Sequence, residues 1–79
     1  LSGYLDIVKL LVGKGVDINK SDSYENTALM LASKKGYLEI AELLIEKGAD
    51  INKSDCYGCT PIRFAFRDGH FKVVKFLLE

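Results

Sequence analysis

The 79 residues include eleven basic and eleven acidic side chains, so the formal net charge is zero. This balance argues against a protein that binds nucleic acid or an anionic membrane through its overall field. The apolar share of 48% is too high for a disordered chain, and this length holds one small domain at most. No apolar run approaches the ~18 residues of a transmembrane helix. We therefore expect neither nucleic acid nor membrane among the partners.

The sequence repeats itself at an interval of 33 residues. The frame that begins at Gly3 returns at Gly36 and Gly69, and residues 3–35 and 36–68 agree at about half of their positions. A period of this length is typical of stacked repeats, in which one unit cannot bury its own apolar face. The period predicts a repeat solenoid of one domain.

The first element, residues 5–12, is predicted to be a long helix. Polar residues recur three apart, at Asp6 and Lys9, among apolar ones. This spacing predicts a helix with a narrow polar stripe and a wide buried face. Gly15 suits the left-handed position after a helix end, and residues 16–22 suit a turn.

The next unit begins with a short helix at residues 27–35. Thr27 is a good N-cap residue, and Gly36 closes the helix. Residues 38–46 then repeat the long-helix pattern, and residues 49–55 repeat the turn.

The last unit repeats the same order. Residues 60–68 predict a short helix that begins at Thr60. Pro61 takes the first helical position, where its missing N–H costs nothing. Residues 71–79 predict a third long helix.

These residues resemble the ankyrin repeat. The matching stretches are "DSYENTALMLASKKGYLEIAELLIEKGADIN" and "DCYGCTPIRFAFRDGHFKVVKFLLE", and the period, the glycines and "GADIN" make the match specific. The resemblance implies an all-α repeat solenoid of stacked helix-turn-helix repeats with projecting hairpin-like turns. It divides the domain 1–79 into the second half of a repeat (1–21), a full repeat (22–54) and an incomplete one (55–79).

The sequence departs from the family pattern at a few positions. Met30 and Arg63 replace the His that ties down the start of the short helix, Glu25 replaces a turn Gly, and Phe66 replaces a small Ala. We expect these changes to weaken the scaffold, or else to mark surfaces reshaped for a partner.

Stacking should align equivalent long-helix positions. Lys9, Glu42 and Lys75 then form one row of alternating charge, while Glu39 faces Lys72. The alternative is an ordinary solvated face, because exposed ion pairs are weak.

Neither end of the chain shows a polar capping repeat, and the first residue is not Met. We therefore expect the chain to be a piece of a longer array, or to self-associate through its exposed stack faces.

No set of residues suggests catalysis, so we expect a non-enzyme without cofactor or metal. The only His is His70, at a position that is structural in the family. Cys56 and Cys59 form a C-x-x-C pair, which is typical of exposed turn thiols, a redox pair or half a zinc site. Zinc would need two further ligands, and only His70 is available. The redox hypothesis remains open.

Two cysteines give no disulfide framework, which favours a reducing, cytoplasmic or nuclear location. The resemblance implies that Asn19 and Asn52 are mainly turn residues. In some cytosolic members of the family the matching Asn is hydroxylated, but the resemblance only weakly implies this modification here.

The resemblance implies a module that binds another protein through its turn tips and its concave short-helix face. Tyr24 and Tyr57 stand one period apart and are the expected anchors, unless each ring packs flat on its own turn. A basic strip at Lys34, Lys35 and Arg67 would attract an acidic partner, although ordinary solubilising charge is the preferred interpretation. The alternatives are a spacer within a longer array and a redox-sensitive module. The predicted partner-binding residues are Ser23, Tyr24, Asn26, Met30, Lys34, Lys35, Cys56, Tyr57, Cys59, Arg63, Arg67 and Asp68.

Overall fold

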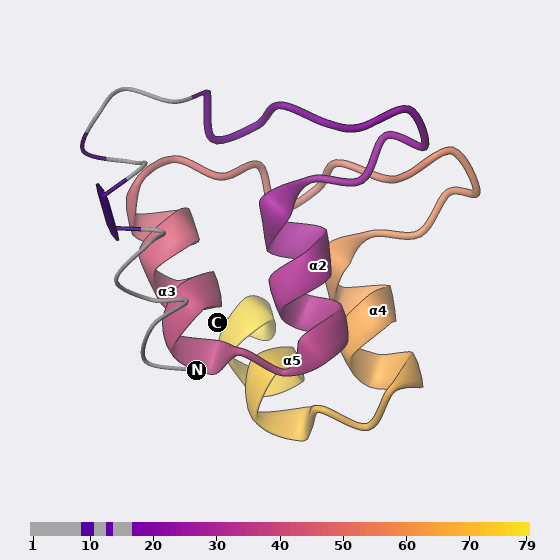
Figure 1. The fold of residues 1–79 in the computed structure, drawn as a ribbon. Helices are drawn as coiled ribbons and strands as arrows, with labels where there is room; N and C mark the ends of the chain where they lie inside the picture. The colour runs from indigo at the N-terminus through magenta and orange to yellow at the C-terminus, as the bar shows by residue number, and fades with distance from the viewer. Residues whose placement is uncertain (1–8, 11–12, 14–16) are drawn as a thin grey trace.

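The computed structural model describes residues 9–10, 13 and 17–79 (Figure 1). Most of the helix predicted at 5–12 lies outside the described residues, as does Gly15.

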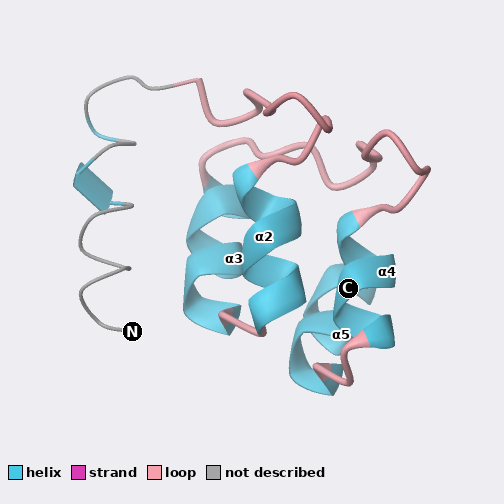
Figure 2. Ribbon diagram, turned by 45° about the vertical axis from the view of Figure 1, so that its right-hand side comes forward, coloured by secondary structure: helices cyan, strands magenta, loops and turns pink. Residues whose placement is uncertain are grey.

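Two helix pairs make up the described part of the chain. They are α2 (Ala28–Lys35) with α3 (Leu38–Glu46), and α4 (Pro61–Arg67) with α5 (Phe71–Leu78). The described residues contain no strand. Helix α2 packs against α4 and α3 packs against α5, so the short and the long helices form two layers (Figures 1 and 2). The connecting turns project away from the helices. This arrangement confirms the predicted all-α repeat fold.

The start of α2 is closed by reciprocal bonds between two side chains and the backbone. The Thr27 hydroxyl accepts the N–H of Met30 at 3.3 Å, and the Met30 thioether accepts the N–H of Thr27 at 3.4 Å. Sulfur is a weak acceptor, but it does part of the work expected of an imidazole. Met30 therefore ties down this helix start in place of the His, through a weaker acceptor, and the expected weakening of the scaffold stays a prediction.

The start of α4 is different. Thr60 is the N-cap residue by position, as predicted, but its side chain makes no capping bond. The N–H of Arg63 instead donates to the backbone oxygen of Thr60 at 3.1 Å. Pro61 occupies the first helical position and is buried.

Both short helices end at a glycine in the left-handed conformation. Gly36 has φ +74° and Gly69 has φ +76°. The N–H of Tyr37 donates back to Ala32 at 2.9 Å, and that of His70 to Ala65 at 2.8 Å. These bonds fold each long helix back beside its short one.

His70 also joins the two repeats. A Cβ atom placed on Gly36 would lie 2.5 Å from the His70 Nδ1. The imidazole therefore packs directly on the backbone at Gly36, as the expected structural role of His70 requires.

The core lies between the two layers. In α3, Glu39 and Glu42 are exposed while Ile40 and Leu44 are buried, which confirms the predicted polar stripe. Within the described residues no ion pair joins α3 to α5, so the solvated-face interpretation fits the charged rows better. The buried apolar residues are Leu29, Met30, Ala32, Ile40, Ala41, Leu44, Phe64, Ala65 and Val73.

Candidate interaction surface

An aspartate closes each turn tip. The Asp22 Oδ1 accepts the N–H groups of Tyr24 and Asn26, both at 2.9 Å. One repeat later, the Asp55 Oδ1 accepts those of Tyr57 and Cys59, again at 2.9 Å. Two such bonds to one carboxylate fix the backbone of each tip, and therefore the direction of its tyrosine.

The same bonds shift the titration of the first aspartate. The N–H of Asn26, followed by that of Tyr24, stabilises the ionised carboxylate and lowers the pKa of Asp22 below its usual value, although partial desolvation opposes the shift. The tip is therefore held by a charged acceptor at neutral pH.

The two tips are joined to each other. The N–H of Cys56 donates to the backbone oxygen of Tyr24 at 3.0 Å, which places the turns side by side (Figure 2). Tyr24 is 59% exposed and Tyr57 is 78% exposed. Exposure this high does not fit a ring packed flat on its own turn.

A second joint lies at the base of the turns. The Asn19 carboxamide accepts the N–H of Asp50 at 2.6 Å and donates to the Gly48 oxygen at 3.2 Å. Asn19 therefore holds the following turn, as a turn residue should. Asn52, its counterpart, uses its backbone N–H to bond the Asp50 carboxylate at 2.9 Å.

Most of the predicted partner-binding residues lie on the surface. Asn26 and Cys59 are half-buried. Met30 is only 1% exposed because its side chain is packed between the helices, so it cannot contact a partner, and the prediction for this residue is wrong. The exposed members are Ser23, Tyr24, Lys34, Lys35, Cys56, Tyr57, Arg63, Arg67 and Asp68.

The basic residues follow the short-helix layer. Lys34 and Arg67 occupy equivalent positions on adjacent helices, and both are exposed. The Arg67 guanidinium lies 5.1 Å from the centre of the Phe64 ring and 4.0 Å from the Asp68 carboxylate. Both contacts are weak at such exposure, so Arg67 is available to a partner.

The pair Cys56 and Cys59 consists of free thiols at the second tip. No cluster of three or more His, Cys, Asp or Glu suited to a metal occurs within the described residues. The redox hypothesis stays a prediction.

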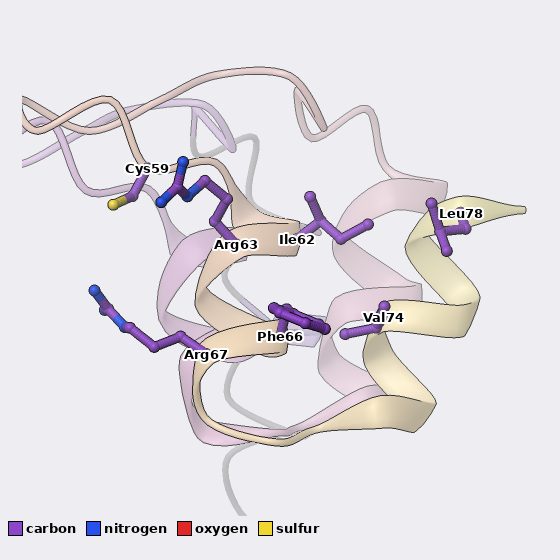
Figure 3. Close-up of a pocket in the computed structure, with 7 residues that line it drawn as sticks. All are labelled: Cys59, Ile62, Arg63, Phe66, Arg67, Val74 and Leu78. Carbon is purple, nitrogen blue, oxygen red and sulfur yellow. The ribbon is translucent and has the colours of Figure 1, made fainter.

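Sequence reasoning missed two groups of residues. Asp22 and Asp55 position the tyrosines, and the signal was their recurrence at the same place in both units. The second group lines an end groove between α4 and α5 (Figure 3) and comprises Ile62, Phe66, Val74 and Leu78.

The comparisons agree with this geometry. The family model for ankyrin repeats, in three copies, matches residues 1–79. The chain therefore belongs to the ankyrin repeat family. A search of curated proteins found no match. Ankyrin repeats are generally protein–protein interaction modules and are typically non-catalytic. Among the described helices, none combines the length and apolar character needed to cross a membrane.

Proposed function

We propose that this chain is a non-catalytic module that binds a partner protein through its turn tips and the adjoining surface of the short helices. The observation that carries the proposal is the pair of exposed tyrosines, Tyr24 and Tyr57, on two hydrogen-bonded tips. Tyrosine is enriched at interaction hot spots. A backbone fixed before binding also lowers the ordering cost of association.

The exposed basic residues at the ends of the short helices favour a partner that carries acidic groups. Lys34 and Lys35 lie in the last turn of α2, and Arg67 lies in the last turn of α4. Both helices lie below the projecting turns (Figure 1). Opposite charge at the rim of an interface raises the association rate more than the affinity.

The test replaces both tyrosines. Partners captured from a lysate of the source cells by the immobilised chain are identified, and the affinity of each purified partner is measured for the wild type and for Tyr24→Ala/Tyr57→Ala. We expect binding to weaken at least tenfold, a loss of about 1.4 kcal/mol, with little change in melting temperature. Glu42→Ala, on the exposed side of α3, is the matched control and should bind like the wild type.

Two results would contradict the proposal. A large fall in melting temperature would show that the tyrosines stabilise the fold. Equal binding by the wild type and the double variant would favour a spacer that no partner contacts at the tips.

We also propose that the chain works in a reducing, intracellular compartment. Cys56 and Cys59 are free thiols, and one of them is exposed at a turn tip. Thiol labelling in intact cells should find both cysteines reduced. A stable disulfide would contradict this proposal and favour the redox module.

A further inference from the structure

The backbone N–H groups of the second turn tip are all engaged within the chain. From Asp55 to Cys59, every N–H donates a hydrogen bond of 2.9–3.0 Å, to the backbone of Tyr24 or within the tip itself. In the first tip, the N–H groups of residues 24–26 all donate to Asp22. A partner strand that joins a sheet edge needs free N–H groups on that edge. The tips must therefore recognise a partner through their side chains.

The most prominent side chains of the tips are the two tyrosines. Both are exposed, and Tyr57 is the most exposed aromatic residue in the described part of the chain. Each offers an apolar ring face and a hydroxyl that donates and accepts hydrogen bonds. The turns that carry them project from the helices (Figure 2), whereas an amphipathic partner helix needs a groove for its apolar face. This surface suits an extended segment that lies across both rings.

The spacing of the two tyrosines follows from how the tips are joined. One backbone bond closes each tip on itself, and the bond from Cys56 to Tyr24 joins the first tip to the second. Backbone segments joined in this way lie about 4.8 Å apart, so equivalent residues of neighbouring tips, two such steps apart, are separated by about 9.6 Å. Packed helices such as α2 and α4 are about 8–10 Å apart, which agrees with this spacing.

A polyproline II helix has the same repeat length. It rises ~3.1 Å per residue with three residues per turn, so residues i and i+3 lie on one side, ~9.3 Å apart. Its backbone makes no internal hydrogen bonds, which leaves its carbonyl groups free to accept bonds from tyrosine hydroxyls. A proline also carries no N–H that would need an acceptor on the tip.

We propose that the two tips bind a proline-rich segment of a partner protein in the polyproline II conformation. Two prolines three residues apart, in the order P-x-x-P, pack on the rings of Tyr24 and Tyr57. The tyrosine hydroxyls donate to carbonyl oxygens of the segment. Aromatic surfaces bind such segments in other proteins because the ligand loses little conformational freedom on binding. This inference rests on the proposed function and names the class of segment that the tyrosines bind.

The experiment selects peptides from a random displayed library of about 12 residues, which span ~37 Å as polyproline II, on the immobilised chain 1–79. We expect P-x-x-P to be enriched. Enriched peptides are then synthesised with a fluorescent label, and fluorescence polarisation gives their affinity. Moving one of the two prolines by a single position should weaken binding about fivefold or more, because the two rings can then no longer be contacted together.

Two tyrosine variants separate the contribution of the rings from that of the hydroxyls. Tyr24→Ala/Tyr57→Ala removes both and should weaken peptide binding about tenfold or more. Tyr24→Phe/Tyr57→Phe keeps the rings and should weaken it about fivefold, since each lost hydrogen bond contributes modestly. Glu42→Ala, on the exposed side of α3, is the matched control and should bind like the wild type. Thermal melting confirms that each variant is folded.

Three outcomes would overturn this inference. One is a selection without P-x-x-P enrichment. Another is equal affinity for peptides with shifted prolines, or for the wild type and the alanine variant. The third is enrichment of acidic peptides without proline that Lys34→Glu/Arg67→Glu no longer binds, which would assign recognition to the basic residues.

Failure here is distinguishable from failure of the proposed function. If partners captured from the lysate lose affinity for Tyr24→Ala/Tyr57→Ala while no P-x-x-P peptide is enriched, the tips bind a partner but not a polyproline II segment. If P-x-x-P peptides bind through the tyrosines while captured partners bind the alanine variant normally, the proposed function fails for those partners and the peptide site stands.

Discussion

The backbone of Glu25 adopts a conformation that favours glycine. Its φ is +64°, and its counterpart in the next tip, Gly58, has φ +81°. A residue with a Cβ atom pays about 1–2 kcal/mol in the left-handed region. The hydrogen bonds to Asp22 hold the tip in this shape nonetheless. The resemblance predicts that the replacement of Gly by Glu25 weakens the scaffold or else marks a surface reshaped for a partner, and the positive φ gives a physical reason for the first.

Glu25→Gly should therefore stabilise the chain. We expect a gain of about 0.5–1 kcal/mol in the free energy of unfolding, since the relief of strain exceeds the added entropy of the unfolded glycine. Urea denaturation measures it. Gly58→Glu is the reverse control and should destabilise by about 1–2 kcal/mol, because open space surrounds a Cβ placed there and only the backbone strain remains. Equal stability of all three proteins would show that the tips tolerate either conformation.

Asn19 and Asn52 occupy equivalent positions in successive turns, but within the described residues only the Asn19 side chain bonds to the next repeat. Asn19→Ala should cost about 1 kcal/mol, since the Asp50 N–H and the Gly48 oxygen lose their partner. Asn52→Ala should change stability little, because within residues 17–79 its carboxamide makes no hydrogen bond. Urea denaturation of the two variants side by side checks the difference. A larger loss for Asn52→Ala would contradict this assignment.

Single residues show what the sequence could and could not predict about the site. The exposure of Tyr24 and Tyr57 followed from their place in a turn. The burial of Met30 did not, because residue type alone does not say that a thioether will accept the Thr27 N–H. The resemblance identified position 30 as the one that ties down the helix start in the family. Because a thioether replaces the imidazole there, the resemblance did not predict whether the side chain would point into the core or toward a partner.

At the scale of elements, the sequence predicted the helices closely. Residues 38–46 form a helix at the predicted bounds, and α5 ends at Leu78, one residue earlier than predicted. Apolar periodicity and the glycines were sufficient, because helix ends follow local rules. The contact between His70 and Gly36 joins residues 34 positions apart and therefore left no local signal.

Two glycines that end short helices allow this contact to be measured. Gly36 and Gly69 have nearly the same φ, so replacement by Ala strains both backbones equally, by about 1 kcal/mol. Only Gly36→Ala also forces a Cβ against the imidazole. It should cost a further ~1–3 kcal/mol. Thermal melts of both variants give the difference, and equal melting temperatures would show that His70 moves aside freely.

At the scale of the whole molecule, the two repeats are coupled through the interface of α2 with α4. Repeat stacks gain much of their stability from such nearest-neighbour interfaces. Ser33 faces this interface with no exposed surface, and its hydroxyl has no hydrogen-bond partner within the described residues. The sequence predicted that the repeats stack. It did not show that the small side chain of Ser33 determines how closely α4 approaches α2. The end groove was missed for the same reason. Only the structure shows that Ser33, at the position equivalent to Phe66, is buried between helices while Phe66 is exposed.

Ser33→Phe, which copies Phe66 into the earlier repeat, should separate the two helix pairs. We expect the free energy of unfolding to fall by about 3 kcal/mol. Because the total free energy of unfolding of a chain of this size is ~3–5 kcal/mol, the unfolding transition should broaden and lose cooperativity. Ser33→Ala keeps the small volume and removes an unpaired hydroxyl, so it should leave stability unchanged or raise it by up to ~1 kcal/mol. Phe66→Ser should alter it by less than ~0.5 kcal/mol, because Phe66 is exposed. Calorimetry of the three variants decides the matter. A cooperative, wild-type-like transition for Ser33→Phe would contradict this prediction and would mean that the stack accepts a phenyl ring between α2 and α4.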